Sequence, residues 1–253
     1  MIRKNFTFVI TTFRSGAVID ECLKDMPKDI RKIIVENSND HNLKDRLENM
    51  YENTECFLMS DNLGYGKANN FGIIKSNTDY VFILNPDTKI TDEKFTKIVS
   101  LLQEQDFAIA APQIVEKNIV YKQNKSDHQI KKVEHVFGMA MILNKRKFGN
   151  NFFDENIFLY HEEIDLCKRM INIGQNILEL NIQLNHLGNQ SHGGYDFEME
   201  KSRNWHWMWS KFYFYKKHHN YFYSFFKTLP NFLSSIFKFL IYKLLTNRKK
   251  SSQ

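Results

Sequence analysis

The chain has 253 residues, 42% of them hydrophobic, which is enough for the core of one large domain or of one domain with an appendage. Three distant cysteines, Cys22, Cys56 and Cys167, exclude a disulfide framework or a clustered thiolate zinc site. The amino-terminal MIRKNFTFVITTF lacks the apolar core and the cleavage site of a signal peptide, so we expect a cytoplasmic protein.

Charge is distributed unevenly. Residues 201–253 contain eleven Lys and Arg and no Asp or Glu, whereas residues 1–200 contain 24 basic and 29 acidic side chains. The carboxy-terminal segment also holds 16 of the 36 aromatic residues. This asymmetry predicts two regions with different roles.

Short apolar runs alternate with helical patterns over the first 112 residues. We predict strands at residues 6–12, 32–37, 55–60, 80–85 and 107–112. Strands this apolar, separated by helices, are typical of an α/β protein with a mostly parallel sheet. Ligands bind such sheets beyond the carboxyl ends of the strands.

Acidic or amide residues lie at or just beyond the ends of three of these predicted strands. They are Glu36 with Asn37, Asp61 with Asn62, and Asn85 with Asp87 in the stretch LNPDT. Each taken alone is explained by the preference of Asp and Asn for turns. Their recurrence at one edge of the sheet favours a binding site.

The stretch NLGYGKANNFG, residues 62–72, supplies two glycines of a dinucleotide-binding fingerprint. Asn69 occupies the third position, so this signal is weak. Alternatively, Gly64 and Gly66 would allow the backbone to pass close to a ligand. Lys67, Asn69 and Asn70 would then face this ligand from the amino terminus of a helix, which is suited to bind an anion. A flexible helix entry is the structural alternative.

A second group of motifs follows residue 113. The pattern predicts a strand within residues 133–148, interrupted by Gly138, a helix from about His161 to Gly174, and a strand at 176–181. The helix begins HEEID, and its acids are explained equally well by the helix macrodipole or by a general base with a raised pKa.

His186 and His192 lie in a Gly-rich polar loop. A histidine there is usually polar surface, but beside Asp87 it would complete a site for Mg²⁺ or Mn²⁺. The sequence contains no GxxxxGK[ST], nucleophile elbow or HExxH, so it lacks the best markers of a P-loop, acyl transfer or zinc proteolysis.

Seven motifs occur in the order that is typical of one known protein family. They are VITTF, VENSND, DNLGYGKANNFG, FILNPDT, FGMAMILNK, FLYHEEIDLCKRM and NHLGNQSH. Over about residues 6–218 the chain resembles family 2 glycosyltransferases of the GT-A fold, in particular bacterial rhamnosyltransferase-like members. The resemblance implies inverting transfer from a nucleotide-diphosphate sugar, such as dTDP-rhamnose or a UDP-sugar, to an acceptor hydroxyl in surface polysaccharide synthesis.

The resemblance also implies residue roles. Thr11, Phe13 and Glu36 would contact the base of the donor. The stretch NLGYGKANN would flank its nucleotide and phosphates, so the implied donor-binding residues also include Asn62, Lys67, Asn69, Asn70, Asn85 and Asp87. The metal would be held by Asp87 and His186, with Asn85 at the first position of the DxD signature.

For the general base the resemblance favours Glu163 over Glu162, because Glu163 matches the second acid of the family's ED pair, where Asp is the common residue. We expect a GT-A catalytic domain over residues 1–200, with a nucleotide-binding half at 1–112 and an acceptor half at 113–200. Residues 201–253 would be amphipathic helices.

Residues 203–219 and 231–246 show helical spacing of aromatic and apolar side chains. Lysines interrupt the second stretch, so we expect it to lie on an anionic membrane surface and not to span it; an oligomer interface is the alternative. A lipid-linked glycan would then be the acceptor. One competing hypothesis is a nucleotide-sugar-binding scaffold with a decayed catalytic site. Another is a nucleic-acid-binding module, but we do not expect the protein to bind nucleic acid.

Overall fold

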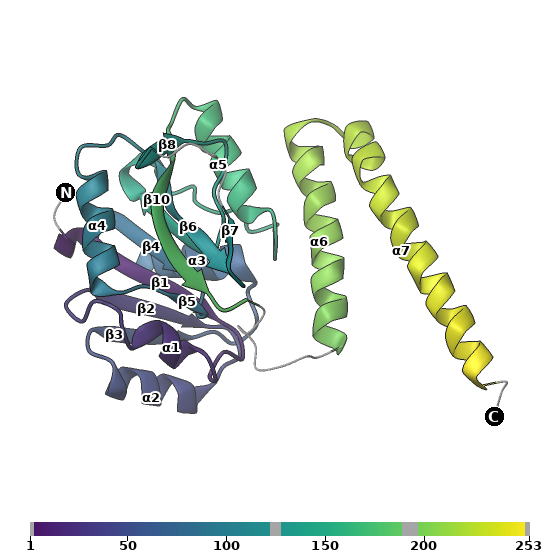
Figure 1. Cartoon of the computed structure of the whole chain (residues 1–253), viewed down its shortest axis with the longest axis horizontal. Coiled ribbons are helices and arrows are strands. Elements are labelled where there is room, and N and C mark those ends of the chain that lie inside the picture. Colours follow the sequence, from purple (N-terminus) through teal and green to yellow (C-terminus); the bar gives the residue numbers. More distant parts are fainter. Residues whose placement is uncertain (1–2, 122–127, 189–196, 251–253) are drawn as a thin grey trace. The chain divides into compact units, whose positions relative to one another are not determined.

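The computed structural model describes residues 3–121, 128–188 and 197–250 (Figure 1). The chain divides into two compact units: residues 1–158 with 162–195, and residues 159–161 with 196–253. The short segment 159–161 therefore belongs to the second unit although it interrupts the first.

A mixed sheet runs through the first unit. Its strands are β1 (Phe6–Thr12), β2 (Arg31–Glu36), β3 (Thr54–Leu58), β4 (Tyr80–Leu84), β5 (Thr88–Lys89), β6 (Ile109–Glu116), β7 (Ile119–Tyr121), β8 (Ile130–Lys132), β9 (Ala140–Asn144) and β10 (Ile177–His186). The strand order is β3-β2-β1-β4-β9-β6-β10-β5, with β7 beside β6 and β8 beside β10.

The predicted parallel arrangement is confirmed in two parts of the sheet. Strand β1 pairs in parallel with β2 and β4, β2 pairs in parallel with β3, and β6 pairs in parallel with β10. Strand β9 runs antiparallel between β4 and β6, so the sheet is mixed at its centre. Every residue of β1 is buried, as expected for a strand covered on both faces.

Helices cover both faces. They are α1 (Ile19–Leu23), α2 (His41–Met50), α3 (Tyr65–Lys75), α4 (Asp92–Leu102) and α5 (Glu162–Asn172). Helices α1, α2 and α4 pack in one apolar cluster, with Phe8 and Ile10, whereas α3 and α5 pack in the other, with Val9. Alternate side chains of β1 thus fill opposite layers.

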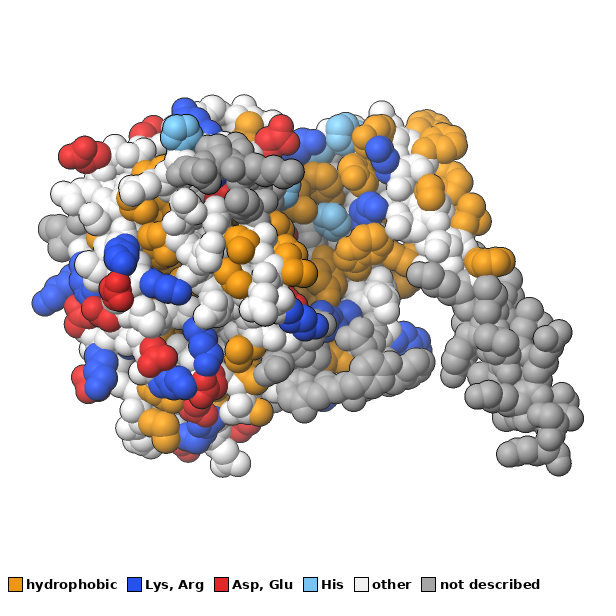
Figure 2. All heavy atoms as spheres, viewed as in Figure 1, with side chains coloured by type: hydrophobic (Ala, Val, Ile, Leu, Met, Phe, Trp, Pro, Cys, Tyr) orange, Lys and Arg blue, Asp and Glu red, His pale blue; other side chains and the backbone are white. Residues whose placement is uncertain are grey.

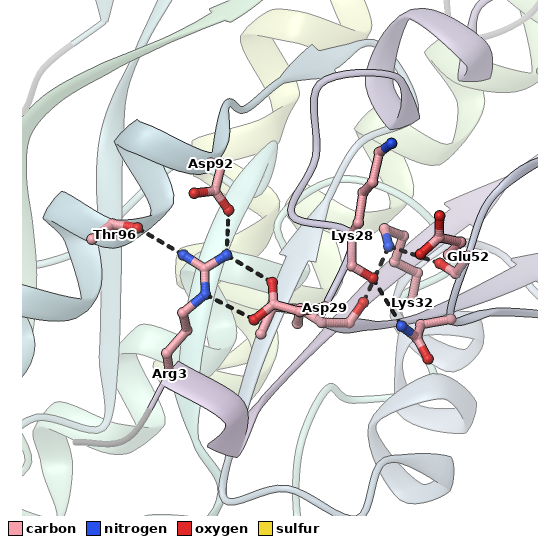
Figure 3. A network of polar contacts seen from close by, with 9 residues as sticks. Arg3, Lys28, Asp29, Lys32, Glu52, Asp92 and Thr96 are labelled. Atoms are coloured by element: carbon pink, nitrogen blue, oxygen red, sulfur yellow. Dashed lines mark hydrogen bonds and ion pairs between the residues drawn. The ribbon is translucent and has the colours of Figure 1, made fainter.

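At the amino ends of the strands, Arg3 joins three elements (Figure 3). Its guanidinium donates to both carboxylate oxygens of Asp29, to Asp92 and to Thr96. Nearby, Nζ of the buried Lys32 donates to the carbonyls of Ile30 and Glu52. These contacts fasten the edge of the sheet opposite the carboxyl ends, where we expect the site.

The second unit is a helical hairpin of α6 (Phe197–His218) and α7 (Tyr221–Lys250). Asn220 caps α7 by accepting from the amide of Tyr223 at 2.8 Å, and Ser224 Oγ donates to the carbonyl of Phe212 at 2.6 Å. Within the described ranges, neither of these helices nor any other is long and apolar enough to cross a membrane.

Candidate active site

The stretch LNPDT forms a turn after β4. The amide of Thr88 donates to the carbonyl of Asn85 at 3.1 Å, with Pro86 and Asp87 between them. The Asn85 amide and the Thr88 hydroxyl both donate to the Met139 carbonyl. The turn is therefore fixed to the chain just before β9, and Asp87 is held at the end of β4.

Strand β5 brings His186 to this turn. It pairs antiparallel with the end of β10, so that Thr88 lies opposite His186, and the Leu187 amide donates to the Asp87 carbonyl at 2.9 Å. Nε2 of His186 lies 3.1 Å from Oδ1 of Asp87. The two residues that the sequence predicts as metal ligands are therefore adjacent.

Asp87 is only 1% exposed, yet neither of its carboxylate oxygens accepts a hydrogen bond of ordinary geometry from the described residues. Its neighbour is the imidazole of His186, which forms an ion pair with Oδ1 when the ring is protonated. A buried carboxylate without donors is costly, which suggests that a positive ligand completes this site.

His186 has a second acidic neighbour that the sequence analysis missed. Its Nδ1 lies at hydrogen-bond distance, 3.1 Å, from Oε2 of Glu116, the last residue of β6. Burial lowers the pKa of His186, but the contacts with Asp87 and Glu116 outweigh burial and raise it. No motif marks Glu116, because its role depends on the pairing of β6 with β10.

A divalent cation fits these donors. An oxygen from Asp87 and the Nε2 of His186 are ligands that Mg²⁺ or Mn²⁺ accepts, and both ions commonly take further ligands from bound phosphates. The described residues contain no cluster of three or more His, Cys, Asp or Glu able to hold a metal unaided. An ion held by Asp87 and His186 would thus have coordination positions left for other ligands.

Two glutamates begin α5. Glu162 is 4% exposed, and burial, reinforced by the charge of Glu163, raises its pKa well above the usual value. Burial also raises the pKa of Glu163, to about 7. Such a carboxylate is suited to take up a proton near neutral pH.

The third acid of this turn has a different environment. Asp165 is completely buried and accepts from Nε of Arg169 at 2.8 Å. Arg169 also donates to the backbone carbonyls of Asn151 and Phe152. The Asp165–Arg169 pair therefore anchors α5, and the raised pKa values of the two glutamates come first from burial and not from repulsion among three acids.

Tyr65 is a partly buried residue whose phenol is affected by the charges of Glu162, Glu163 and Asp87. The sequence analysis did not identify it. Its hydroxyl donates to the carbonyl of Gly138 at 2.6 Å. Burial raises the pKa of Tyr65 well above its usual value, as do the negative charges of Glu162, Glu163 and Asp87. The charges of Glu162, Glu163 and Asp87 thus all disfavour ionisation of the same phenol.

Gly138 lies beside Glu163. A β-carbon at Gly138 would lie 3.6 to 3.8 Å from the side chain of Glu163, in ordinary van der Waals contact. The glycine that interrupts the predicted strand before β9 therefore lies next to the predicted base.

The glycines of NLGYGKANN pack against protein and not against open space. A β-carbon at Gly64, where φ is +76°, would lie 2.3 Å from the carbonyl oxygen of Phe158. Asn70 exchanges hydrogen bonds with the backbone of Phe153, and Asn69 donates to the carbonyl of Tyr65. Lys67 is exposed, 3.8 Å from Glu155. The donor-binding roles of Lys67, Asn69 and Asn70 remain predictions.

The residues expected around the donor base lie at the carboxyl ends of β1 to β3. Thr11 Oγ1 is buried without a hydrogen bond among the described residues, whereas Phe13 is partly exposed. Glu36 is buried and accepts from the amides of Ser38 and Asp40, and Asn62 accepts from the Gly64 amide. Glu36 thus shapes its own loop, and its reading of a base remains a prediction.

The chain enters α5 through residues of the second unit. Tyr160 and His161 adopt left-handed conformations, with φ of +68° and +69°. Ser210 Oγ donates to the Leu159 carbonyl at 2.7 Å, Arg203 Nε donates to the Tyr160 hydroxyl, and the His161 ring stacks on Phe214. Burial lowers the pKa of His161 to about 4. The predicted loop residue His192 lies outside the described residues.

A hollow of about 310 Å³ lies at the opposite edge of the sheet. Lys4, Asp29, Asn53 and Thr78 are among its lining residues, and Asp87, Glu163 and His186 are not. Ligands bind α/β sheets at the carboxyl ends of the strands, and this hollow lies at the amino ends. We therefore locate the candidate site by Asp87, Glu163 and His186 and not by the hollow.

Solved structures with the same arrangement identify the fold. The chain aligns with Staphylococcus aureus TarS, residues 1–349 in complex with UDP, at a TM-score of 0.61 and 16% identity, over 72% of this chain and 60% of that one. It aligns with GalNAc-T7, solved with UDP, GalNAc and Mn²⁺, at a TM-score of 0.58 and 11% identity, over 72% and 43%. The first unit therefore has a GT-A-like α/β fold.

The family follows from the sequence comparison. The model of glycosyl transferase family 2 matches residues 7–171, and the chain belongs to that family. A low-salt glycan biosynthesis hexosyltransferase of Haloferax volcanii, Agl10, is 24% identical over 200 residues, which cover 68% of this chain. The chain spans 64% of the length of that relative.

Proposed function

We propose that the protein is an inverting glycosyltransferase that moves a sugar from a nucleotide-diphosphate donor to an acceptor hydroxyl. The observation that carries this proposal is the buried Asp87, whose carboxylate accepts no hydrogen bond of ordinary geometry from the described residues and lies 3.1 Å from His186. It lies at the sheet edge where GT-A-like folds bind nucleotide sugars. Membership of glycosyl transferase family 2 supports the same reaction class.

Glu163 is the general base in this proposal. The acceptor hydroxyl oxygen attacks the anomeric carbon and the carbon–oxygen bond to the diphosphate breaks, while the hydroxyl proton passes to a carboxylate oxygen of Glu163. A pKa of about 7 allows Glu163 to be ionised before the step and to hold the proton after it. One carboxylate suffices, because inversion needs no covalent intermediate.

The departing diphosphate gains negative charge. Asp87 and His186 would hold a Mg²⁺ or Mn²⁺ ion, which supplies electrostatic stabilisation of that charge when bound. Lys67, on the first turn of α3, would add a second positive charge near the phosphates. The structure of GalNAc-T7 was solved with Mn²⁺, which supports this choice of metal.

A donor screen tests the proposal. The full chain is incubated with Mn²⁺ or Mg²⁺ and a panel of UDP-, dTDP- and GDP-sugars, and release of the nucleoside diphosphate is measured with and without glycan acceptors. We expect turnover of one donor and its loss in Glu163→Gln. Donor binding without turnover, unchanged by Glu163→Gln, would instead support a nucleotide-sugar-binding scaffold.

The donor sugar is the finer part of the proposal. The motif resemblance favours dTDP-rhamnose, whereas UDP in the TarS structure and the hexosyltransferase name of Agl10 favour a UDP-hexose. The acceptor we propose is a lipid-linked glycan of a surface polysaccharide, because helix α7 offers a means of attachment to the membrane that carries such lipids.

Helix α7 presents an apolar surface with basic residues beside it, and Figure 2 shows hydrophobic side chains gathered there. Lys216, Lys217 and Lys227 are exposed in the same hairpin. Among the described side chains of α7, the exposed apolar ones are Tyr221, Phe222, Tyr223, Phe225, Phe226, Phe232, Leu233 and Phe237. Aromatic side chains next to lysines are suited to the interface of an anionic bilayer, so we propose peripheral binding to the inner face of the cell membrane.

Vesicle sedimentation tests this attachment. We expect the full chain to sediment with phosphatidylglycerol vesicles but not with phosphatidylcholine vesicles. Phe222→Ser with Phe226→Ser should release it, whereas Ile74→Ser, an exposed apolar residue of α3, should not. If the full chain does not bind and light scattering shows a dimer that the Phe222 and Phe226 changes dissociate, the surface is a homo-oligomer interface instead.

A further inference from the structure

A side chain outside the motifs, Glu116, faces the back of the proposed metal ligand His186. Oε2 of Glu116 lies 3.1 Å from Nδ1, while Nε2 on the other side of the ring lies 3.1 Å from Asp87. The imidazole is thus held between two carboxylates, one on each nitrogen. It is largely buried, with 9% of its side chain exposed.

The backbone around Glu116 is held by strand pairing on both sides. Strand β6 continues into β7 through Lys117 and Asn118, whose φ values of +49° and +65° form a tight two-residue turn, and Glu116 pairs with Ile119 across it. On the other side, Asn185 pairs with Val115 in the parallel ladder of β6 and β10. Glu116 and His186 therefore extend from adjacent, paired strands.

Gly188 leaves room for this carboxylate. Its φ is +66°, and a β-carbon on it would lie 2.3 Å from Oε1 of Glu116. The backbone conformation therefore favours glycine at this position of the stretch NHLGNQSH, and a side chain there would displace the Glu116 carboxylate.

We propose that Glu116 is a positioning residue that accepts the Nδ1 hydrogen bond of His186 and so keeps Nε2 directed at the metal beside Asp87. A carboxylate on the far nitrogen of a ligating histidine fixes its tautomer and orientation and makes it a better ligand. This inference rests on the proposed metal-dependent function. Glu116 would bring a further carboxylate to the metal site, in which the first position of the DxD signature is the neutral Asn85.

Binding of Mn²⁺, measured by electron paramagnetic resonance of the free ion in the presence of UDP, tests the role without any turnover. Loss of a partner behind a ligating histidine weakens metal binding about 10- to 100-fold, and we expect this for Glu116→Gln. The exposed Glu104→Gln is the matched control and should bind as the unmutated chain does.

A double-mutant cycle separates positioning from a structural role. If Glu116 acts through His186, Glu116→Gln should have no further effect in a His186→Ala background. A further loss there of the same size, or unchanged Mn²⁺ binding by Glu116→Gln alone, overturns the inference while Mn²⁺ binding by the unmutated chain upholds the metal site. Absence of Mn²⁺ binding by the unmutated, folded chain overturns both.

Discussion

His186 and Asp87 lie 3.1 Å apart because the short strand β5 pairs with the end of β10 immediately after the LNPDT turn. This pairing brings together residues that are distant in the sequence, and it places a histidine against a buried carboxylate that accepts no hydrogen bond of ordinary geometry within the described part of the chain. The predictions that follow use this site and its surroundings.

The change Asp87→Asn should abolish metal-dependent donor binding and leave the unfolding free energy within about 1 kcal/mol, since the lost ion pair with His186 is offset by relief of the desolvated charge. Calorimetric titration of UDP with Mn²⁺ and urea unfolding measure the two effects. Asp165→Asn is the opposite control: it leaves Arg169 without its buried partner and should cost about 3–5 kcal/mol. Metal-dependent binding that survives in Asp87→Asn would remove Asp87 from the site.

The rate of transfer should increase with pH through about 7, because Glu163 must lose its proton before it can act as base. The Glu163→Gln variant should be slower by roughly 10²- to 10⁴-fold and should lack this pH dependence. Steady-state kcat/KM between pH 5 and 9 gives both results. If Glu162→Gln shows the larger loss and the flat profile, Glu162 is the base.

Glu163→Gln should also stabilise the protein at alkaline pH. Burial raises the pKa of Glu163 from 4.5 to about 7, so the folded state retains a proton that the unfolded state releases. Its stability therefore falls as the pH rises from about 4.5 to about 7 and stays low above that range. At pH 8 we expect a gain of the order of 1–3 kcal/mol in the variant, and almost none near pH 4, measured by urea unfolding.

Gly64→Ala should destabilise the protein more than Gly149→Ala. Both glycines have positive φ, but nothing lies within 4 Å of a β-carbon at Gly149, whereas one at Gly64 meets the backbone oxygen and ring of Phe158. The difference between the two variants should exceed about 1 kcal/mol in thermal unfolding, because Gly64 combines the clash with Phe158 with a backbone conformation, φ +76° and ψ −175°, that is essentially restricted to glycine. Equal losses would show that Phe158 moves away without cost.

The sequence predicted the fold class well because its signal is local. Strand β1 was predicted at its observed bounds, and the start of α5 within one residue, since apolar runs and acidic first turns depend on neighbouring residues. The insertion of β9 antiparallel between β4 and β6 could not be predicted, because strand order depends on contacts between distant segments.

The site was predicted unevenly for the same reason. Asp87 and His186 follow strands and carry recognisable motifs, and the structure brings them together. Glu116 belongs to no motif, and Tyr65 lies within NLGYGKANNFG without a role that the pattern assigns to it; both become relevant only through strand pairing and packing. The side-chain amide of Asn70 exchanges hydrogen bonds with the backbone of Phe153, which its motif did not indicate, and its donor-binding role stays a prediction.

The assignment of Leu159–His161 to the second unit affects how a shortened protein should be designed. A chain cut after residue 200 would lack Arg203, Ser210 and Phe214, which hold the three residues preceding Glu162. Tyr160 and His161 would then keep their left-handed conformations, at about 1–3 kcal/mol each, without that support. A shortened protein for crystallisation should therefore end at the turn around Asn220, keeping α6 and omitting only α7.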